Sequence, residues 1–260
     1  MKISVISPHR GHACFSLGLS LIRWARAGHR IRLVNCFTRS NDAPFSDADT
    51  VHANDRTSYV SAMREREDEV FLRRVPGSEK VDLRLKDAPI RLRCGVDAVY
   101  GRAVDVADPA IAKIRAALEK RGSPEPGEIF LLPLGVGHHV DCTTAREAVL
   151  PFVHGVAFGF YEDQPYGSHT GAEQELQGLE KEVALRTGVR LPPTICASDP
   201  AAGQSKRELV GIYASQMDAQ TADAIARSAE KLGGERIWAS QRLADLVQGG
   251  IAGWSGPPTG

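Results

Sequence analysis

The sequence has no excess of either charge, no long apolar run and no clustered cysteines. Its 260 residues carry 32 Lys plus Arg against 32 Asp plus Glu, so it lacks the cationic surplus on which general nucleic-acid binders and membrane-surface proteins depend. No stretch approaches the ~20 consecutive apolar residues of a membrane span. We therefore expect neither a nucleic-acid nor a membrane partner. The expected partner is a small-molecule substrate, and the sequence leaves homo-oligomerisation open.

The five cysteines are scattered, and none belongs to a Cys-x-x-Cys pair. The N-terminal segment becomes polar after six residues, which is too early for the apolar region of a signal peptide. An odd, dispersed set of cysteines without an export signal is typical of reduced thiols. We therefore expect a cytoplasmic protein.

Hydrophobic residues make up 42% of the chain and charged residues 25%, the balance of an ordinary globular protein. A strand at 3–7, an apolar-periodic helix that stops at Gly28 and a strand at 29–37 form a βαβ unit, which implies a parallel sheet. Further strands are expected at 129–134 and 155–161. A surface loop is expected at 39–56, and helices at 61–74, 110–120, 143–150, 173–186 and 205–216. We predict a single α/β domain over 1–260, with a flexible tail from about residue 250.

Two loops that follow predicted strands are rich in residue types that bind metals. Residues 7–12 and 135–142 together supply His9, His12, His138, His139, Asp141 and Cys142. Ligands of open parallel sheets bind outside the carboxyl ends of the strands, so both loops are expected at the active edge. Two histidines with a cysteine or an aspartate could close a zinc site that keeps one open position.

Each of these residues also has a plainer explanation. A loop histidine is more often hydrogen-bonded or solvated than a ligand, and Cys142 could be a small buried hydrophobe. Asp141 could cap the following helix. Arg64 and Glu67 could form an ion pair on a solvated helix face. The spacing alone leaves these alternatives open.

Several short motifs nevertheless follow one another in a recognisable order. They are Ser7-Pro8-His9, Arg64-x-x-Glu67-Asp68, Asp97–Tyr100, Gly137-His138-His139-Val140-Asp141, Tyr161–Tyr166 and Lys206 with Tyr213-x-Ser215-Gln216. Over about residues 1–245, this order resembles the LmbE-like, or PIG-L, family of zinc-dependent N-deacetylases, which hydrolyse N-acyl amino sugars and related amides. The resemblance implies a Rossmann-like, mostly parallel sheet flanked by helices.

The resemblance also implies roles for individual residues. His9, His12 and Cys142 take the family's metal positions, the last two in place of Asp and His. This softer set would favour zinc, with iron or another transition metal as the alternative. His139 matches the histidine that stabilises the transition state. Gly11 stands where the family has its general base, and general-base catalysis is typically worth about 10²–10⁴ in rate.

A replacement base is therefore needed for hydrolysis. Asp141 is the expected base, a substrate group is another source, and His138, Glu162 and Asp163 are further candidates. Arg64, Glu162 and Asp163 are expected to contact the substrate. Putting an aspartate back at position 11 is expected to return a base to the site.

We accordingly expect an enzyme, a metal-dependent hydrolase that cleaves the N-acyl (amide) bond of a small polar substrate of the amino-sugar or natural-product type. Two alternatives stay open. One is a repurposed member that uses a His/His/Cys metal site for non-hydrolytic biosynthetic chemistry. The other is a non-catalytic relative that binds a ligand or a partner.

Overall fold

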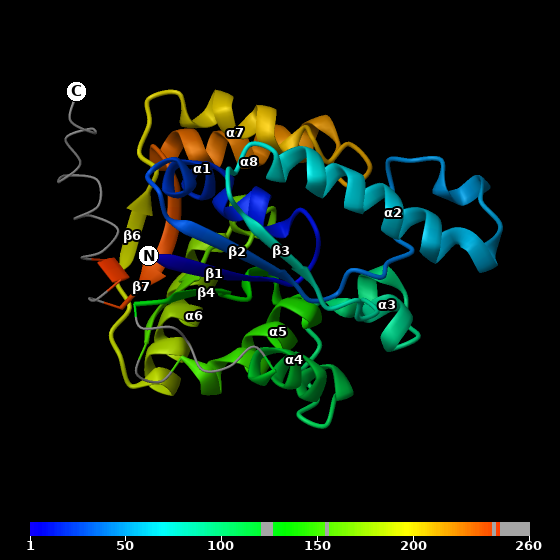
Figure 1. The fold of residues 1–260 in the computed structure, drawn as a ribbon, viewed down its shortest axis with the longest axis horizontal. Coiled ribbons are helices and arrows are strands. Elements are labelled where there is room, and N and C mark those ends of the chain that lie inside the picture. The colour runs from blue at the N-terminus through cyan, green and yellow to red at the C-terminus, as the bar shows by residue number, and fades with distance from the viewer. Residues whose placement is uncertain (121–126, 154–155, 241–242, 245–260) are drawn as a thin grey trace.

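The computed structural model describes residues 1–120, 127–153, 156–240 and 243–244 (Figure 1). The predicted tail from about residue 250 lies outside the described residues.

Seven strands form one sheet with the order β3-β2-β1-β4-β5-β7-β6. Their bounds are β1 Lys2–Ser7, β2 Arg30–Asn35, β3 Glu79–Asp82, β4 Ile129–Pro133, β5 Ala157–Tyr161, β6 Pro193–Cys196 and β7 Glu235–Ala239. The first five strands pair in parallel, whereas β7 runs antiparallel to both β5 and β6. The predicted α/β class with a mostly parallel sheet is confirmed.

Helices cover both faces of this sheet (Figure 1). They are α1 His12–Arg26, α2 Ala53–Leu72, α3 Ala88–Arg91, α4 Pro109–Glu119, α5 Val140–Val149, α6 Ala172–Thr187, α7 Ala202–Val210 and α8 Ala219–Leu232. Helices α1, α7 and α8 lie over one face, and α4, α5 and α6 lie over the other. Among the described residues, no helix combines the length and apolarity needed to cross a membrane.

The central strands are buried on both faces, which explains their continuous apolar sequences. Alternate residues of β4 point to opposite sides, so Leu131 packs with α1 and α7 while Leu132 packs with α5 and α6. Burial of a leucine side chain contributes about 1.5–3 kcal/mol. The sheet is thus a rigid support for the loops at its carboxyl edge.

Two helices begin earlier than the sequence predicts, because histidines cap them. His52 accepts a hydrogen bond from the Asn54 amide at 3.3 Å, and α2 begins at residue 53 rather than 61. His139 accepts from the Asp141 amide at 3.1 Å, and α5 begins at residue 140 rather than 143. Helix α7 ends at Val210, whereas the prediction carried it to Gln216.

Candidate active site

Strands β1 and β4 are neighbours in the sheet, so the two histidine-bearing loops lie side by side at their carboxyl ends. The ring centroids of His9 and His139 are 5.0 Å apart, and those of His9 and His12 are 6.4 Å apart. All three histidines line a cavity of about 260 Å³. The sequence predicts both loops at the carboxyl edge of the sheet, and the pairing of β1 with β4 brings their histidines together there.

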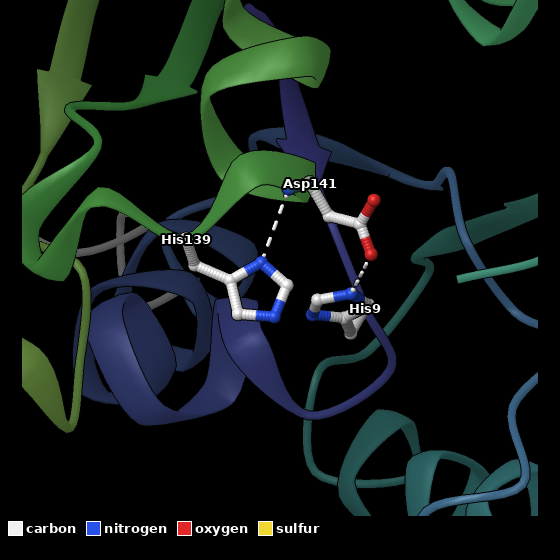
Figure 2. A group of neighbouring side chains, drawn as sticks. All are labelled: His9, His139 and Asp141. Carbon is white, nitrogen blue, oxygen red and sulfur yellow. Dashed lines mark hydrogen bonds and ion pairs between the residues drawn. The ribbon is translucent and has the colours of Figure 1, made fainter. Parts of the chain in front are cut away.

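Asp141 holds the ring of His9 through a hydrogen bond (Figure 2). Its Oδ2 lies 2.8 Å from His9 Nε2 and accepts the Ala88 amide at 2.8 Å, while Oδ1 accepts from Arg91 at 2.7 Å. Burial alone would raise its pKa, but the hydrogen bond to His9 and the charges of His9 and Arg91 lower the pKa of Asp141 to about 2. The carboxylate is therefore ionised, and His9 donates to it through Nε2–H.

His139 is held as a neutral hydrogen-bond donor. Its Nδ1 accepts the amide of Asp141 at 3.1 Å, so the proton of the neutral ring sits on Nε2. Burial and the neighbouring His9 lower the pKa of His139 to about 3. Figure 2 shows the second nitrogen of His139 facing the ring of His9. The N-cap of α5 is thus His139, and Asp141 is not the cap.

A second group of side chains, His12, Cys142 and Asp163, is buried. One carboxylate oxygen of Asp163 is hydrogen-bonded to His12 Nε2 at 3.0 Å. The other oxygen accepts hydrogen bonds from the backbone amides of Gly135 and Val136, at 2.7 and 3.2 Å. Burial raises the pKa of Cys142 well above its ordinary value, with the charge of Asp163 adding to the effect. Without a cation, Cys142 is therefore a protonated thiol.

The predicted metal ligands fall into two adjacent groups. Atoms of His9, His139 and Asp141 lie within 4.8 Å of one another, as do atoms of His12, Cys142 and Asp163, and either group could hold an ion. The set His9, His12 and Cys142 is not gathered within that distance among the described residues. Two imidazoles on one tetrahedral zinc would have centroids about 5 Å apart, slightly closer than His9 and His12 are here.

The histidines nevertheless have the orientation of metal ligands. His9 and His12 each place Nε2 against a buried carboxylate, the arrangement that commonly orients a histidine whose other nitrogen binds a metal. In the described part of the chain, neither Nδ1 atom makes a hydrogen bond. Imidazole nitrogens with a buried sulfur form a donor set that suits zinc. The residues present thus fit a soft divalent metal.

The predicted substrate residues lie in different places. As far as the structure describes the chain, the cavity lining includes Arg64 but neither Glu162 nor Asp163. Arg64 is buried and lies 3.4 Å from a carboxylate oxygen of Asp42. Glu162 accepts from Arg236 at 2.7 Å and is likewise buried. Their substrate contacts stay predictions.

The acidic residues of the Arg64-x-x-Glu67-Asp68 motif hold the chain after α7. Glu67 accepts from the Ser215 amide and hydroxyl, both at 2.8 Å. Asp68 accepts from the Tyr213 hydroxyl at 2.9 Å. The motif is therefore a structural clamp between α2 and the Tyr213-x-Ser215-Gln216 segment, and Arg64 pairs with Asp42 instead of Glu67.

Position 11 is closed to a side chain by packing. Gly11 has φ +91°, and a Cβ built on it would lie 2.7 Å from the Phe15 ring and 3.0 Å from the Tyr213 ring. A side chain here is opposed both by the backbone conformation and by the two rings. An aspartate cannot simply be put back at position 11.

The structure also adds residues that the sequence did not single out. Asp87, Gln164, Tyr100 and Tyr166 line the cavity. The two tyrosine hydroxyls lie 3.5 Å apart, and both tyrosines belong to motifs already noted, which could have indicated them. Asp87 had no such signal, because it stands alone in a loop between β3 and α3.

Comparisons with known proteins bear on the fold. No family model and no curated protein matches the chain at the level of sequence. A deacetylase of teicoplanin biosynthesis, solved as a complex, has a TM-score of 0.63 at 20% identity, covering 92% of this chain and 97% of that one. The A40926 pseudoaglycone deacetylase Dbv21 has a TM-score of 0.61 at 23% identity, covering 92% and 96%. The zinc-inhibited form of the teicoplanin deacetylase Orf2 has a TM-score of 0.60 at 19% identity, covering 93% and 99%.

These likenesses extend over most of each chain, so they concern the whole arrangement of strands and helices. They confirm the fold that the resemblance predicts. The chain has the fold of the LmbE-like zinc deacetylases.

Proposed function

We propose that this protein is a metal-dependent hydrolase that cleaves the N-acyl bond of a small polar substrate, of the amino-sugar or natural-product type. The observation that carries the proposal is the neutral Nε2–H of His139 on the wall of a cavity that His9 and His12 share. Amide hydrolysis passes through an oxyanion, and one positioned donor to such an oxyanion is worth about 10²–10³ in kcat.

The metal would be held by His9, His12 and Cys142, which would have to draw closer to one another than they are among the described residues. Asp141 and Asp163 would orient the two histidine rings, as their hydrogen bonds to Nε2 already do. Zinc is the expected metal, and iron is the alternative for this soft donor set. Such an ion acts as a Lewis acid and lowers the pKa of water.

The chain's own residues provide binding and charge stabilisation. His139 donates to the carbonyl oxygen as negative charge develops on it. Arg64, buried at the cavity wall, offers hydrogen bonds to acceptors of the substrate. Tyr100 and Tyr166 contribute aromatic surface, since the Tyr100 ring lies 5.4 Å from His139 and 5.8 Å from Tyr166.

The test combines metal content with product analysis. Zinc-loaded protein is incubated with a panel of N-acyl amines, and the released acid and amine are quantified. His139→Gln should lower kcat by about 10²–10³ with unchanged metal content. His138→Gln is the matched control, because His138 is exposed and its ring faces Glu175 at 3.5 Å.

Release of acid and amine in equal amounts supports the proposal. Consumption of substrate without acid release would instead favour the non-hydrolytic alternative, which the closed Gly11 position makes worth testing. Loaded protein that turns over none of the amides would overturn the proposed function.

A further inference from the structure

Amide hydrolysis at this site needs a proton acceptor, and position 11 cannot supply it. The side chains expected to replace it as a base are already hydrogen-bonded or ion-paired to other groups. Asp141 is ionised, and it accepts hydrogen bonds from His9, Arg91 and the Ala88 amide. Three donors compete for its lone pairs, so it is a poor acceptor for a proton from water.

The remaining predicted bases are equally occupied. Asp163 accepts hydrogen bonds from His12 and from two backbone amides. Glu162 is paired with Arg236, and His138 is exposed beside Glu175. Within the described residues, none of these three side chains lines the cavity.

Asp87 differs from all of them. Its side chain is 3% exposed and lines the same cavity as His9 and His139. The Ser40 hydroxyl acts to lower the pKa of the carboxyl group, whereas Oδ1 is buried and has no hydrogen-bond partner among the described residues. A buried carboxyl oxygen left unpaired is uncommon in folded proteins and calls for an explanation.

The backbone holds Asp87 firmly in this position. Its amide donates to the Arg39 carbonyl at 3.0 Å, and its carbonyl accepts the Arg91 amide at 2.8 Å. Although Asp87 precedes α3 at the N-cap position, its side chain makes no cap hydrogen bond within the described chain. The carboxyl group therefore does not cap the helix, although an aspartate at this position usually does.

We propose that Asp87 is the general base of this site, replacing the acceptor that Gly11 cannot provide; this inference rests on the proposed amide hydrolysis. Asp87 Oδ1 takes one proton from the attacking water while the water oxygen bonds to the carbonyl carbon. The same proton then passes to the departing nitrogen as the C–N bond breaks. The products are one carboxylic acid and one amine, and Asp87 returns to its starting state.

The surroundings support this assignment. Burial raises the pKa of Asp87, while Ser40 and the nearby His9 and Arg64 oppose the rise. A carboxylate that is partly desolvated holds a proton more readily than an exposed one, which suits an acceptor that must pass the proton on. Asp42, the other carboxylate of the lining, is 42% exposed and lies beside Arg64.

The experiment compares Asp87→Asn and Asp87→Ala with wild type in the zinc-loaded state. Both variants should lose about 10²–10⁴ in kcat while keeping their metal content and urea midpoint. Added formate should restore turnover in Asp87→Ala in proportion to its concentration, because a small carboxylate can occupy the vacated space. Asp105→Asn, at an exposed loop position outside the cavity lining, is the matched control.

The outcomes separate this inference from the proposed function. Wild type that hydrolyses amides while Asp87→Asn keeps more than a tenth of its kcat overturns the base assignment alone. Loss of metal or stability in the variants, or an Asp87→Ala rate that formate does not raise, assigns Asp87 a structural role and also overturns it. Wild type without hydrolysis overturns the proposed function, and the inference with it.

Discussion

Any side chain at position 11 should destabilise the fold, and the size of the effect follows from two features. The first is the backbone, since Gly11 has φ +91° and a residue with a Cβ in such a region costs roughly 1–3 kcal/mol. The second is the contact with Phe15, only 2.7 Å from the position of the added Cβ. Overpacking of this kind typically costs about 1–3 kcal/mol.

Gly11→Ala should therefore lower the free energy of unfolding by about 2–6 kcal/mol, a large part of the 5–15 kcal/mol typical of a domain. The assay is urea denaturation with two optical probes. Gly28→Ala is a matched control for the backbone effect, because Gly28 has φ +84° and a Cβ there would meet nothing within 4 Å in the described chain. Gly11→Ala should lower the free energy of unfolding more than Gly28→Ala does, and the difference should equal the cost of the Phe15 contact.

Equal destabilisation of the two alanine variants would show that the crowding by Phe15 contributes no free energy and would refute this prediction. The crowding also predicts that Gly11→Asp gains no amidase activity. This reverses the expectation from sequence, where an aspartate at position 11 seemed a simple way to return a base. A Phe15→Ala, Gly11→Ala double variant should show favourable coupling, since removal of the ring relieves the close contact.

Three further predictions concern the metal, the pH dependence of stability and the buried ion pair. Cys142→Ala and His9→Ala should each lose bound metal by elemental analysis while keeping their circular dichroism spectra, and full occupancy in either would exclude that ligand. Burial lowers the pKa of His139 from 6.5 to about 3, so the unfolded chain binds a proton that the folded chain does not. Stability should fall as the pH drops from about 6.5 towards 3, and urea midpoints of His139→Gln should fall less over this range. Lys206→Met leaves Glu235 buried without its cation and should cost about 3–5 kcal/mol, whereas Arg207→Met, at a half-exposed pair with Asp223, should cost about 0–1 kcal/mol.

Much of the fold could be predicted because its central elements have strong periodicity. The apolar run at 129–134 and the first βαβ unit are long enough to identify without tertiary context. Strands β3 and β6 escaped prediction because each has only four residues at an edge of the sheet. Three of the four side chains of β3 are charged, and β6 begins with a proline. Strand β7 carries charged residues at its start, and the burial of Glu235 there depends on Lys206 from α7.

The sequence could predict which edge of the sheet carries the site, because that edge is determined by where the strands end. The sequence predicts both loops at the carboxyl edge of the sheet. The meeting of His9 and His139 depends in addition on the adjacency of β1 and β4, which the first βαβ unit does not determine because it pairs β1 with β2. The tautomer of His139 does not follow from the sequence, because it depends on a cap formed by its own ring. Asp87 could not be identified, since its place beside the cavity depends on the path of the chain after β3.

The motifs themselves divide by what their residues contact. Glu67 and Asp68 match the family pattern because they bind Ser215 and Tyr213, and this clamp would be needed whatever the cavity does. The number of positions that match the motifs therefore reflects residues that stabilise the fold as much as residues that face the cavity. The residues that line the cavity are a better guide to chemistry: they include His9, His12 and His139, whereas Gly11 and Cys142 are not part of the described lining. Under the proposed function, hydrolysis depends on whether a carboxylate reaches the water, and Asp87 is the buried carboxylate of the described lining with an oxygen that has no hydrogen-bond partner.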